Sequence, residues 1–371
     1  MKIVLLLVSV DNEFQNSGCE EELKYKVYFT CYLFILLISF GCGSSAYLNT
    51  NRHKMSQAPK NIILSQVAGL GVTHLGALKF GLQSDQEIDF SESYSCSGVL
   101  WPQNFSTMRP KTFDAMNGQI FGSKSMDGSC QDFELIPFWD RYLTKDKQVI
   151  ILEIGSDKST SLEGKLSCEG KNILEKVTLL KMNSGKEGSG EYFDYKKRGA
   201  FKPGVFFDRN CALGNNKKCQ STAFENIRYV FENGFVKNKN VIFLIRDFNY
   251  QKLLKKRKFK AAFTYLQALF SALQVENFQG NIPRDLLTLV LGSSSSEIEF
   301  PKSATDWNSL IEGRSLSLFR YSGLQSLSLA RGASAENFCG SFFDSEVVER
   351  IFFHAERKKS VTDFFQGIIE W

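Results

Sequence analysis

The stretch NIILSQVAGLG, residues 61–71, has the pattern of a buried strand that runs into a glycine-containing turn. The next residues, Val72 to Phe80, suit a helix, so this part of the chain predicts a strand, a turn and a helix in succession. Four further strand-like runs follow along the chain: QVIILEIGS from Gln148, NVIFLIRDF from Asn240, LLTLVLGSS from Leu286 and SLSLARGA from Ser326.

These runs are continuously apolar and rich in Val, Ile and Leu, and helical stretches such as Phe259 to Gln274 separate them. Strands of this composition are typical of sheets that are covered on both faces. We therefore predict a doubly wound α/β domain over residues 61–371, with a mainly parallel sheet and helices on both faces. Between about residues 157 and 239 Lys, Gly, Asn and Ser dominate, which predicts an irregular insertion over the sheet.

The composition indicates a globular domain without a dominant charged surface. The 371 residues are 43% apolar, which is enough for a substantial core, and the net charge is only +5. We expect no nucleic-acid partner. The densest basic run could attract phosphates or anionic lipid headgroups, although a solvated helix face is the simpler interpretation. This run contains Lys252, Lys255, Lys256, Arg257, Lys258 and Lys260.

An apolar run near the N-terminus predicts export. It extends over about fifteen residues from Val27 to Gly41 and follows Lys24 and Lys26. The run is too short for a comfortable transmembrane helix and fits the apolar region of a signal peptide. Gly41-Cys42, followed by small residues, resembles a lipobox, in which the cysteine is acylated and becomes the mature N-terminus. Residues 1–42 are therefore predicted to be a signal peptide with a lipidation site at Cys42.

This prediction places the protein in the bacterial cell envelope, attached to a membrane by lipid and facing the periplasm or the cell surface. Residues 43–60 are polar and suit a tether between the lipid and the domain. Glu20 to Glu22 precede a region that should be basic, which favours translation starting near Leu23 to Tyr25. The alternative is a single membrane anchor, which also leaves the domain outside the cytoplasm.

Six cysteines follow Cys42, and an even number in an exported chain predicts disulfides. The sequence does not choose among the fifteen complete pairings, although Cys211 and Cys219 would close a short loop. None of the six has CxxC or Cys/His spacing, so a zinc site built on cysteine is not expected. They are Cys96, Cys130, Cys168, Cys211, Cys219 and Cys339.

Four stretches, in this order along the chain, resemble the alkaline phosphatase and sulfatase superfamily. They are KNIILSQVAGLG from Lys60; SYSCSGVLWPQNFSTM from Ser93 with FDAMNGQIFGSKS after it; VIFLIRDFNYQ with LLTLVLGSSSS after it; and LARGASAENFCGSFFDSEVVERIF from Leu329 to Phe352. The resemblance implies an alkaline phosphatase-like α/β fold. In active members, a Ser, Thr or modified Cys at a helix start is the nucleophile, and Asp and His residues at strand ends bind metal ions that neutralise phosphoryl or sulfuryl oxygens.

Most of the ligands that the resemblance implies are missing here. Ala68 stands at the end of the first strand, where a carboxylate is expected. Asp247 stands at the expected carboxylate after the third strand, but Gln251 replaces the histidine four residues later. Ser293-Ser294 replaces an Asp-His pair. Neutral oxygen donors bind Zn²⁺ poorly in place of carboxylate and imidazole, so we expect no metal cofactor.

The residues that remain offer several candidate roles. In the resemblance the nucleophile falls within SYSCSG, at Ser95, Cys96 or Ser97, and Asp247 is the one remaining metal ligand, unless it merely caps or pairs beside Arg246. His74 is the only histidine near the expected pocket, and it is either a ligand or base or a hydrogen-bonded structural residue. The GSSSSE cluster could cradle an anion or form an ordinary polar loop. Its candidate anion-binding residues are Ser293, Ser294 and Ser295.

Three functions are compatible with these observations. The first is a catalytically degenerate, alkaline phosphatase-like envelope lipoprotein that binds a protein or small molecule or acts as a scaffold. The second is a metal-dependent phosphate or sulfate ester hydrolase with a rearranged site, which would need Zn²⁺ or Ca²⁺. The third is a structural envelope protein with an aromatic-rich contact surface. The missing ligands favour the first, in which the protein is not an active enzyme.

Overall fold

The computed structural model describes residues 59–81, 94–102, 110–127, 129–142, 147–163, 174–182, 191–193, 201–208, 211, 216–235, 240–274, 285–299, 302–312, 314, 319–321 and 324–356. All of them belong to His53–Trp371, one of the two units into which the chain divides. The predicted signal peptide, Cys42 and most of the predicted tether lie outside the described residues. No helix in these ranges is both long enough and apolar enough to cross a membrane.

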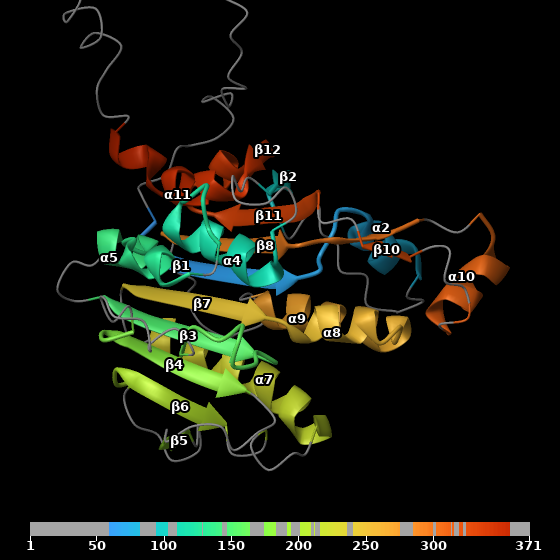
Figure 1. The fold of residues 1–371 in the computed structure, drawn as a ribbon, viewed down its shortest axis with the longest axis horizontal. Helices are drawn as coiled ribbons and strands as arrows, with labels where there is room; N and C mark the ends of the chain where they lie inside the picture. Colours follow the sequence, from blue (N-terminus) through green and yellow to red (C-terminus); the bar gives the residue numbers. More distant parts are fainter. Residues whose placement is uncertain are drawn as a thin grey trace, which may run out of the picture. The chain divides into compact units, whose positions relative to one another are not determined.

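The strands appear where the apolar runs predict them, and further strands accompany them. They are β1 (Asn61–Ala68), β2 (Cys96–Trp101), β3 (Gln148–Ile154), β4 (Val177–Met182), β5 (Glu191–Phe193), β6 (Gly204–Asp208), β7 (Val241–Asp247), β8 (Leu286–Ser293), β9 (Ser296–Ile298), β10 (Phe319–Tyr321), β11 (Ser326–Gly332) and β12 (Gly340–Phe343). Strands β9 and β10 pair with each other. The others form one sheet in the order β12-β2-β11-β8-β1-β7-β3-β4-β6-β5 (Figure 1).

The large sheet is mainly parallel, as predicted. Among the described strands only β11 runs antiparallel to its neighbours, β8 and β2. The arrowheads of β1, β7, β3 and β4 therefore point to the same side, on which α8 lies (Figure 1). The carboxyl ends of parallel strands in an open α/β sheet are the usual place for a ligand, because the connecting loops converge there.

Helices cover both faces of the sheet. The α-helices are α2 (Thr73–Gly81), α4 (Thr112–Phe121), α5 (Phe138–Tyr142), α7 (Asn216–Val230), α8 (Asn249–Lys255), α9 (Phe259–Leu273), α10 (Ala304–Ile311) and α11 (Val347–Glu356). Shorter turns are the 3-10 helices η1 (Cys130–Glu134), η5 (Ala335–Phe338) and η6 (Asp344–Glu346) and the π-helix η3 (Phe231–Phe235).

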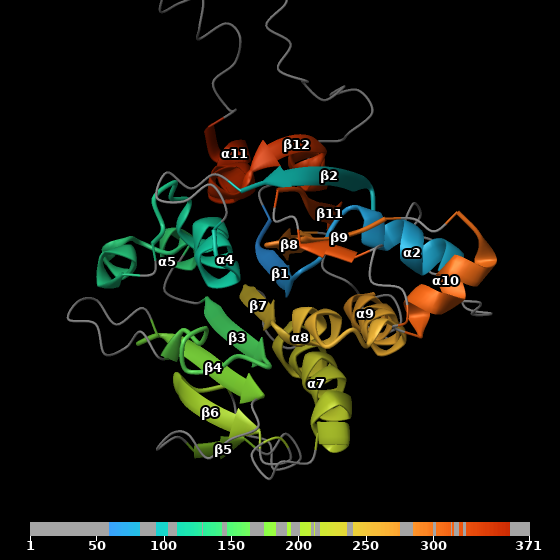
Figure 2. The same ribbon diagram turned by 45° about the vertical axis from the view of Figure 1, so that its right-hand side comes forward.

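The alternation of side chains along the strands produces two apolar cores. On β7, Phe243 and Ile245 face a core that contains residues of α2, α7, α8, α9 and α10, whereas Ile242 and Leu244 face a core formed with α4, α5 and α11. Figure 2 shows α4 and α5 on one side of the strands and α7, α8 and α9 on the other. A sheet buried on both faces explains why its strands are continuously apolar rather than alternating.

Residues 157–239 are less irregular than the sequence predicts. Their described parts include β4 and β6, which extend the sheet in parallel register beyond β3, and α7, which packs on one face. The apolar runs in this region are short, VTLLKM and GVFFD, and Lys-, Gly- and Asn-rich segments surround them. The apolar runs of β4 and β6 are short, but each segment forms a strand because it pairs in parallel with its neighbour in the sheet.

A disulfide joins the amino end of β2 to the residue before β12. Cys96 and Cys339 are 243 residues apart in the sequence, and their Cα atoms are 4.9 Å apart. Cys130 and Cys211 each take part in a disulfide as well. The prediction of disulfides is thus confirmed for these four cysteines, while the suggested pair of Cys211 with Cys219 stays a prediction.

Candidate functional site

The strand ends singled out in the sequence lie next to one another. Ala68, the last residue of β1, pairs with Ser293, the last residue of β8. On the other side of β1, Val67 pairs with Asp247, the last residue of β7. Ala68, Asp247 and Ser293 therefore share the carboxyl edge of the sheet, the position that suits a ligand site in such a fold.

Helix α4 begins beside these strand ends, and its first residue is Thr112. The Thr112 hydroxyl lies 3.2 Å from Oε1 and 3.1 Å from Nε2 of Gln251. The Ser293 hydroxyl is 3.5 Å from the carbonyl oxygen of Thr112, and Gln251 Nε2 is 3.5 Å from that of Ser294. A hydroxyl is thus held at the positive end of a helix dipole by neutral groups from α8 and β8.

The predicted nucleophile region, Ser95 to Ser97, lies apart from the other candidate residues. Cys96 is bonded to Cys339, so it carries no free thiol. In the sheet it is level with Ala330 and Leu289, four residues before the end of β8 at Ser293. Four residues of strand correspond to roughly 13 Å, so Ser95, Cys96 and Ser97 do not lie with the other candidate residues.

Thr112 is a hydroxyl residue at a helix start beside these strand ends, and it was not predicted from the sequence. Residues 102–111 separate it from β2, so Thr112 lies well beyond the SYSCSG motif in the sequence. A signal was available, because Pro110 and then Thr112 stand just before FDAM, and proline and threonine are common where a helix begins. Lys111, immediately before Thr112, is exposed.

Asp247 serves a local structural role in addition to its place at the edge. Its Oδ1 accepts hydrogen bonds from the backbone N–H groups of Asn249, at 2.7 Å, and Tyr250, at 3.4 Å, in the first turn of α8. Burial raises the pKa of Asp247 to about 7, against the hydrogen bonds from Asn249, Tyr265 and Tyr250 that lower it. The capping role that the sequence left open is therefore present.

The side chains at this edge do not fit a divalent-metal site. Ala68 has no donor atom, Gln251 is engaged with Thr112 and Ser294, and one oxygen of Asp247 is engaged by α8. In the part of the chain that the structure describes, no group of three or more His, Cys, Asp and Glu residues could hold a metal ion. Zinc sites are built from imidazole, thiolate and carboxylate, so the neutral donors found here would bind zinc weakly.

His74 is a buried residue beside the GSSSSE loop. Its Nδ1 lies 2.8 Å from the Tyr250 hydroxyl and 3.4 Å from the backbone nitrogen of Gly71. Burial lowers the pKa of His74 to about 4, opposed by a hydrogen bond with the backbone of Ser296. The imidazole is therefore neutral near pH 7 and has hydrogen-bonding partners, which matches the structural interpretation of this histidine.

The GSSSSE loop is folded against the end of β1 and is buried. The backbone N–H of Gly69 donates to the carbonyl of Ser293 at 2.7 Å, and that of Ser296 donates to the carbonyl of Gly69 at 3.0 Å. Ser294 has a positive φ of 50°. A Cβ at Gly292 would lie 2.1 Å from the carbonyl oxygen of Leu70, so only glycine allows the two strand ends to approach so closely. Ser293, Ser294 and Ser295 are all buried within this loop.

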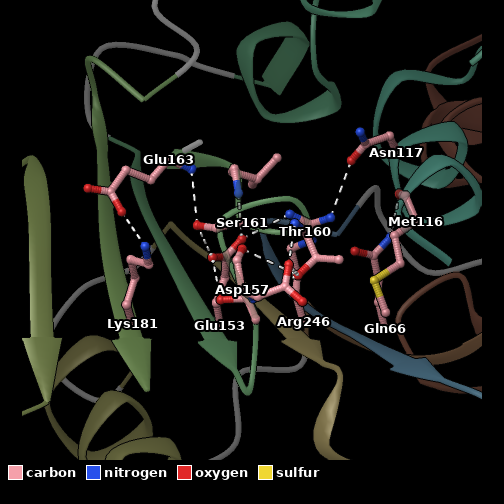
Figure 3. A network of polar contacts seen from close by, with 12 residues as sticks. Gln66, Met116, Asn117, Glu153, Asp157, Thr160, Ser161, Glu163, Lys181 and Arg246 are labelled. Carbon is pink, nitrogen blue, oxygen red and sulfur yellow. Dashed lines mark hydrogen bonds and ion pairs between the residues drawn. The ribbon is translucent and has the colours of Figure 1, made fainter. Parts of the chain in front are cut away.

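A row of polar side chains crosses the sheet beneath α4 (Figure 3). Lys181, Glu153, Arg246 and Gln66 stand opposite one another on β4, β3, β7 and β1. Arg246 Nη1 lies 2.9 Å from Glu153 Oε1, both side chains are fully buried, and Nη2 lies 3.3 Å from Asn117 Oδ1 on α4. Lys181 forms an ion pair with Glu163.

The Glu153 carboxylate accepts three hydrogen bonds in addition to its ion pair with Arg246. The Ser161 hydroxyl donates to it at 2.6 Å, the Ser156 hydroxyl at 3.1 Å and the backbone N–H of Leu162 at 2.9 Å. The Arg246 guanidinium lies 5.2 Å from the ring centre of Phe113 on α4. Buried charges are tolerated when they are paired and hydrogen-bonded in this way.

Amide side chains continue this row from β1 to the far end of α4. Gln66 Nε2 donates to the Met116 carbonyl at 2.7 Å and to Gln119 Oε1 at 2.9 Å. Gln119 Nε2 donates in turn to the Gly292 carbonyl at 3.0 Å and to Asp344 Oδ1 at 2.9 Å. Burial raises the pKa of Asp344 to about 7, against the hydrogen bond from Gln119. Helix α4 is thus fixed to the sheet by directed hydrogen bonds along its length.

Comparison with solved structures identifies the fold. A cold-active alkaline phosphatase from the psychrophile Shewanella sp. is similar with a TM-score of 0.59 at 10% identity, over 79% of this chain and 99% of the other. The alkaline phosphatase of the Antarctic bacterium TAB5 is similar with a TM-score of 0.54 at 10% identity, over 81% and 99%. The alkaline phosphatase of Thermus thermophilus is similar with a TM-score of 0.54 at 10% identity, over 84% of this chain and 94% of the other.

The class is therefore that of proteins with an alkaline phosphatase fold, as the resemblance implied. No protein-family model matches the chain, and no curated protein matches its sequence. With about one residue in ten identical, these similarities establish the architecture, while function must be argued from the site.

The buried ion pair leads to a stability prediction. Arg246→Met leaves Glu153 as an unpaired buried charge, and Glu153→Gln leaves Arg246 unpaired, so we expect each change to lower the free energy of unfolding by about 3–5 kcal/mol. The double variant with Arg246→Met and Glu153→Gln should lose less than the sum of the two single losses. Urea unfolding measures this, with the exposed pair Arg314 and Glu312 as control, where Arg314→Met should have little effect. Additive losses would contradict the coupling.

The raised pKa of Asp344 leads to a prediction about pH. Below about pH 4 this carboxyl is protonated in both folded and unfolded chains, whereas between pH 4 and about 7 only the unfolded chain ionises, so the unfolded chain gains stability as pH rises. Asparagine resembles the protonated acid and accepts the same Gln119 bond. Asp344→Asn should therefore raise the melting temperature at pH 8 and have little effect at pH 4.

Asp157→Asn is the matched control for this experiment. Although burial tends to raise it, hydrogen bonds from Ser159 and Thr160 hold the pKa of Asp157 below its usual value. Its replacement should therefore lower stability at pH 8, and the loss should disappear as the pH falls through that pKa. An equal gain from Asp344→Asn at pH 4 and pH 8 would show that its effect does not come from ionisation.

Proposed function

We propose that this protein is an envelope lipoprotein that binds a phosphate- or sulfate-bearing ligand at the carboxyl edge of its sheet without hydrolysing it. The observation that carries the proposal is the hydrogen-bonded pair of Thr112 and Gln251. A hydroxyl stands at the helix start where the resemblance implies a nucleophile, and an amide stands where it implies a metal-binding histidine.

The absence of charged donors argues against hydrolysis. Metal ions in such sites stabilise developing negative charge by several kcal/mol and favour the deprotonated nucleophile. Around Thr112 the described partners are the amide of Gln251 and the hydroxyl of Ser293, both neutral. Neither group is basic enough to take a proton from a threonine hydroxyl near neutral pH, so Thr112 lacks an activating partner among these contacts.

The same groups support binding of an anion. The start of α4 lies at the positive end of its helix dipole, which favours a bound anion. The exposed Lys111 directly before Thr112 adds a positive charge at the entrance to this end of the helix. A fold shared with alkaline phosphatases supports a ligand related to phosphate esters.

The proposal includes attachment of the protein to a membrane through lipid on Cys42, with the domain in the periplasm or at the cell surface. The run from Val27 to Gly41 and the small residues after Cys42 support it. The paired cysteines also suit an oxidising compartment.

The competing function is a metal-dependent hydrolase with a rearranged site. In that case Thr112, rather than Ser95, Cys96 or Ser97, is the candidate nucleophile, because it is the hydroxyl at the start of α4. Asp247 would then be the carboxylate ligand, and the remaining donors would have to come from residues outside the described ranges.

Ligand binding and turnover can be tested on the same protein. We expect the purified chain to lack stoichiometric Zn²⁺ and Ca²⁺ and to leave aryl phosphate, phosphodiester and sulfate ester uncleaved. Inorganic phosphate should raise its melting temperature, and Thr112→Val with Lys111→Gln should reduce this shift severalfold, because they remove a hydrogen-bond donor and a charge beside the helix end. Ser95→Ala, a change to a distant exposed hydroxyl, is the control and should leave the shift unchanged.

Two outcomes would contradict the proposal. Bound metal together with turnover that both Asp247→Ala and Thr112→Ala abolish would establish the hydrolase instead. An equal phosphate shift in the Thr112 and Ser95 variants would show that phosphate binds elsewhere.

Attachment through Cys42 has its own test. We expect mass spectrometry of the envelope-purified protein to find an acylated Cys42 as the mature N-terminus, because the apolar run, the small residues and the polar tether occur in the order that lipoprotein export requires. An intact peptide that spans Leu36 to Ala46 would show that this site is not cleaved.

A further inference from the structure

The turn between α8 and α9 concentrates positive charge on one part of the surface. Within nine residues it carries six cations, and all six are exposed. No acidic residue occurs from Phe248 to Val275. These six charges compare with a net charge of only +5 for the whole chain, so most of the other charges of the chain balance one another. We call this group of cations the basic turn, and it consists of Lys252, Lys255, Lys256, Arg257, Lys258 and Lys260.

The backbone holds the basic turn in a defined shape. The N–H of Arg257 donates to the Leu254 carbonyl at 2.8 Å, and that of Lys258 donates to the Leu253 carbonyl at 3.0 Å. This is the pattern that ends many helices with a glycine in the left-handed conformation. Here Arg257 adopts a φ of 58° in that position. The chain therefore has a cation at the tip of the turn, where glycine would fit with less strain.

The apolar neighbours of these cations anchor the turn to the domain. Leu254 and Phe259 are fully buried in the core that α8 and α9 share with the sheet, and Tyr250 is buried with them. Lys252 and Lys255 of α8 are exposed, as is Lys256, which directly follows the helix. The cations thus project from two packed helices, and little further ordering is needed for them to meet a charged surface.

We infer that the basic turn contacts the anionic headgroups of the membrane to which the chain is attached. The inference rests on the proposed attachment, but not on ligand binding at Thr112. Either interpretation of the run from Val27 to Gly41, a lipid anchor or a membrane anchor, keeps the domain near a bilayer. Cys42 and Pro59 are separated by 17 residue-to-residue steps, which span at most about 60 Å when the chain is fully extended.

A domain that is held within this distance of a bilayer can bind it through individually weak contacts. A Lys or Arg close to an anionic bilayer improves binding about fivefold, and several act together because the charge of the bilayer is spread over its surface. A tethered domain also meets the bilayer at a high effective concentration. A broad, exposed group of cations suits an extended anionic surface better than a single small ligand, which requires converging donors.

The contact would orient the candidate site. Gln251, which holds Thr112, is next to Lys252 in α8, and α8 follows directly from the carboxyl end of β7. The basic turn and the candidate site therefore belong to the same end of the sheet (Figure 1). A bilayer bound by the basic turn would lie on the side of the domain where the strands end.

The test measures lysine acetylation on vesicles that carry the full-length chain. The vesicles consist of phosphatidylcholine alone or of phosphatidylcholine mixed with phosphatidylglycerol, and mass spectrometry gives the acetylation rate of each lysine. We expect the lysines of the basic turn to react at least about fivefold more slowly on the anionic vesicles, and high salt to remove the difference. The exposed Lys60, Lys158 and Lys302 should react equally on both.

Matched variants assign the effect to the basic turn. Lys255→Gln, Lys256→Gln and Lys258→Gln together should abolish the protection of Lys252 and Lys260 on anionic vesicles. Lys60→Gln, Lys158→Gln and Lys302→Gln remove the same charge elsewhere and should preserve it. Equal acetylation rates on neutral and anionic vesicles would overturn the inference. Protection by soluble polyphosphate but not by anionic vesicles would also overturn it and would identify a soluble polyanion as the partner.

Failure of the proposed attachment gives a different result. A chain that does not float with neutral vesicles is not attached through its N-terminal region, whatever its lysines do. Protection of the basic turn on anionic vesicles would still support the contact in that case. A chain that floats with both kinds of vesicle but shows no protection overturns the contact and leaves the attachment intact.

Discussion

The buried ion pair between Arg246 and Glu153 is the interaction on which the arrangement around the candidate site depends. It joins β7 to β3 in the middle of the sheet, and through Asn117 it also holds α4. A charge with no exposed surface requires its partner in one place, whereas apolar contacts tolerate small shifts. The pair therefore fixes where α4 begins relative to the strand ends, and that start is Thr112.

The uncharged amide side chains of Gln66, Gln119 and Gln251 also help to fix the position of α4 relative to the sheet. Each of them donates to or accepts from at least two groups, so α4 is attached to β1 and β8 and, at its start, to α8. A hydrogen-bonded network favours a single arrangement of a polar interior. Three buried atoms of this network, Gln66 Oε1, Asn117 Nδ2 and Arg246 Nε, have no hydrogen-bond partner among the described residues. The candidate site is consequently built into the scaffold, rather than formed by loops that close on a ligand.

The fold could be predicted from the sequence because a parallel sheet buried on both faces leaves a strong signal, the uninterrupted apolar runs of β1, β3, β7 and β8. The order of the strands also brought Ala68, Asp247 and Ser293 to one edge, as expected. Thr112 was missed because a helix start has no apolar signal of its own. The bond between Cys96 and Cys339 joins residues far apart in sequence, and cysteine spacing alone cannot identify such a pair.

The neutral character of most side chains at this edge has a physical reason. Carboxylates grouped around a cation become mutually repelling buried charges when the cation is absent, and each would shift its pKa upwards or destabilise the fold. Ala68, Gln251, Ser293 and Ser294 avoid that cost together, since none of them ionises. Asp247 is the exception, and its environment fits this view: two backbone N–H groups engage it, and burial raises its pKa to about 7. Hydroxyl and amide groups at the start of a helix can still attract an anion, because they offer donors beside the positive end of the helix dipole.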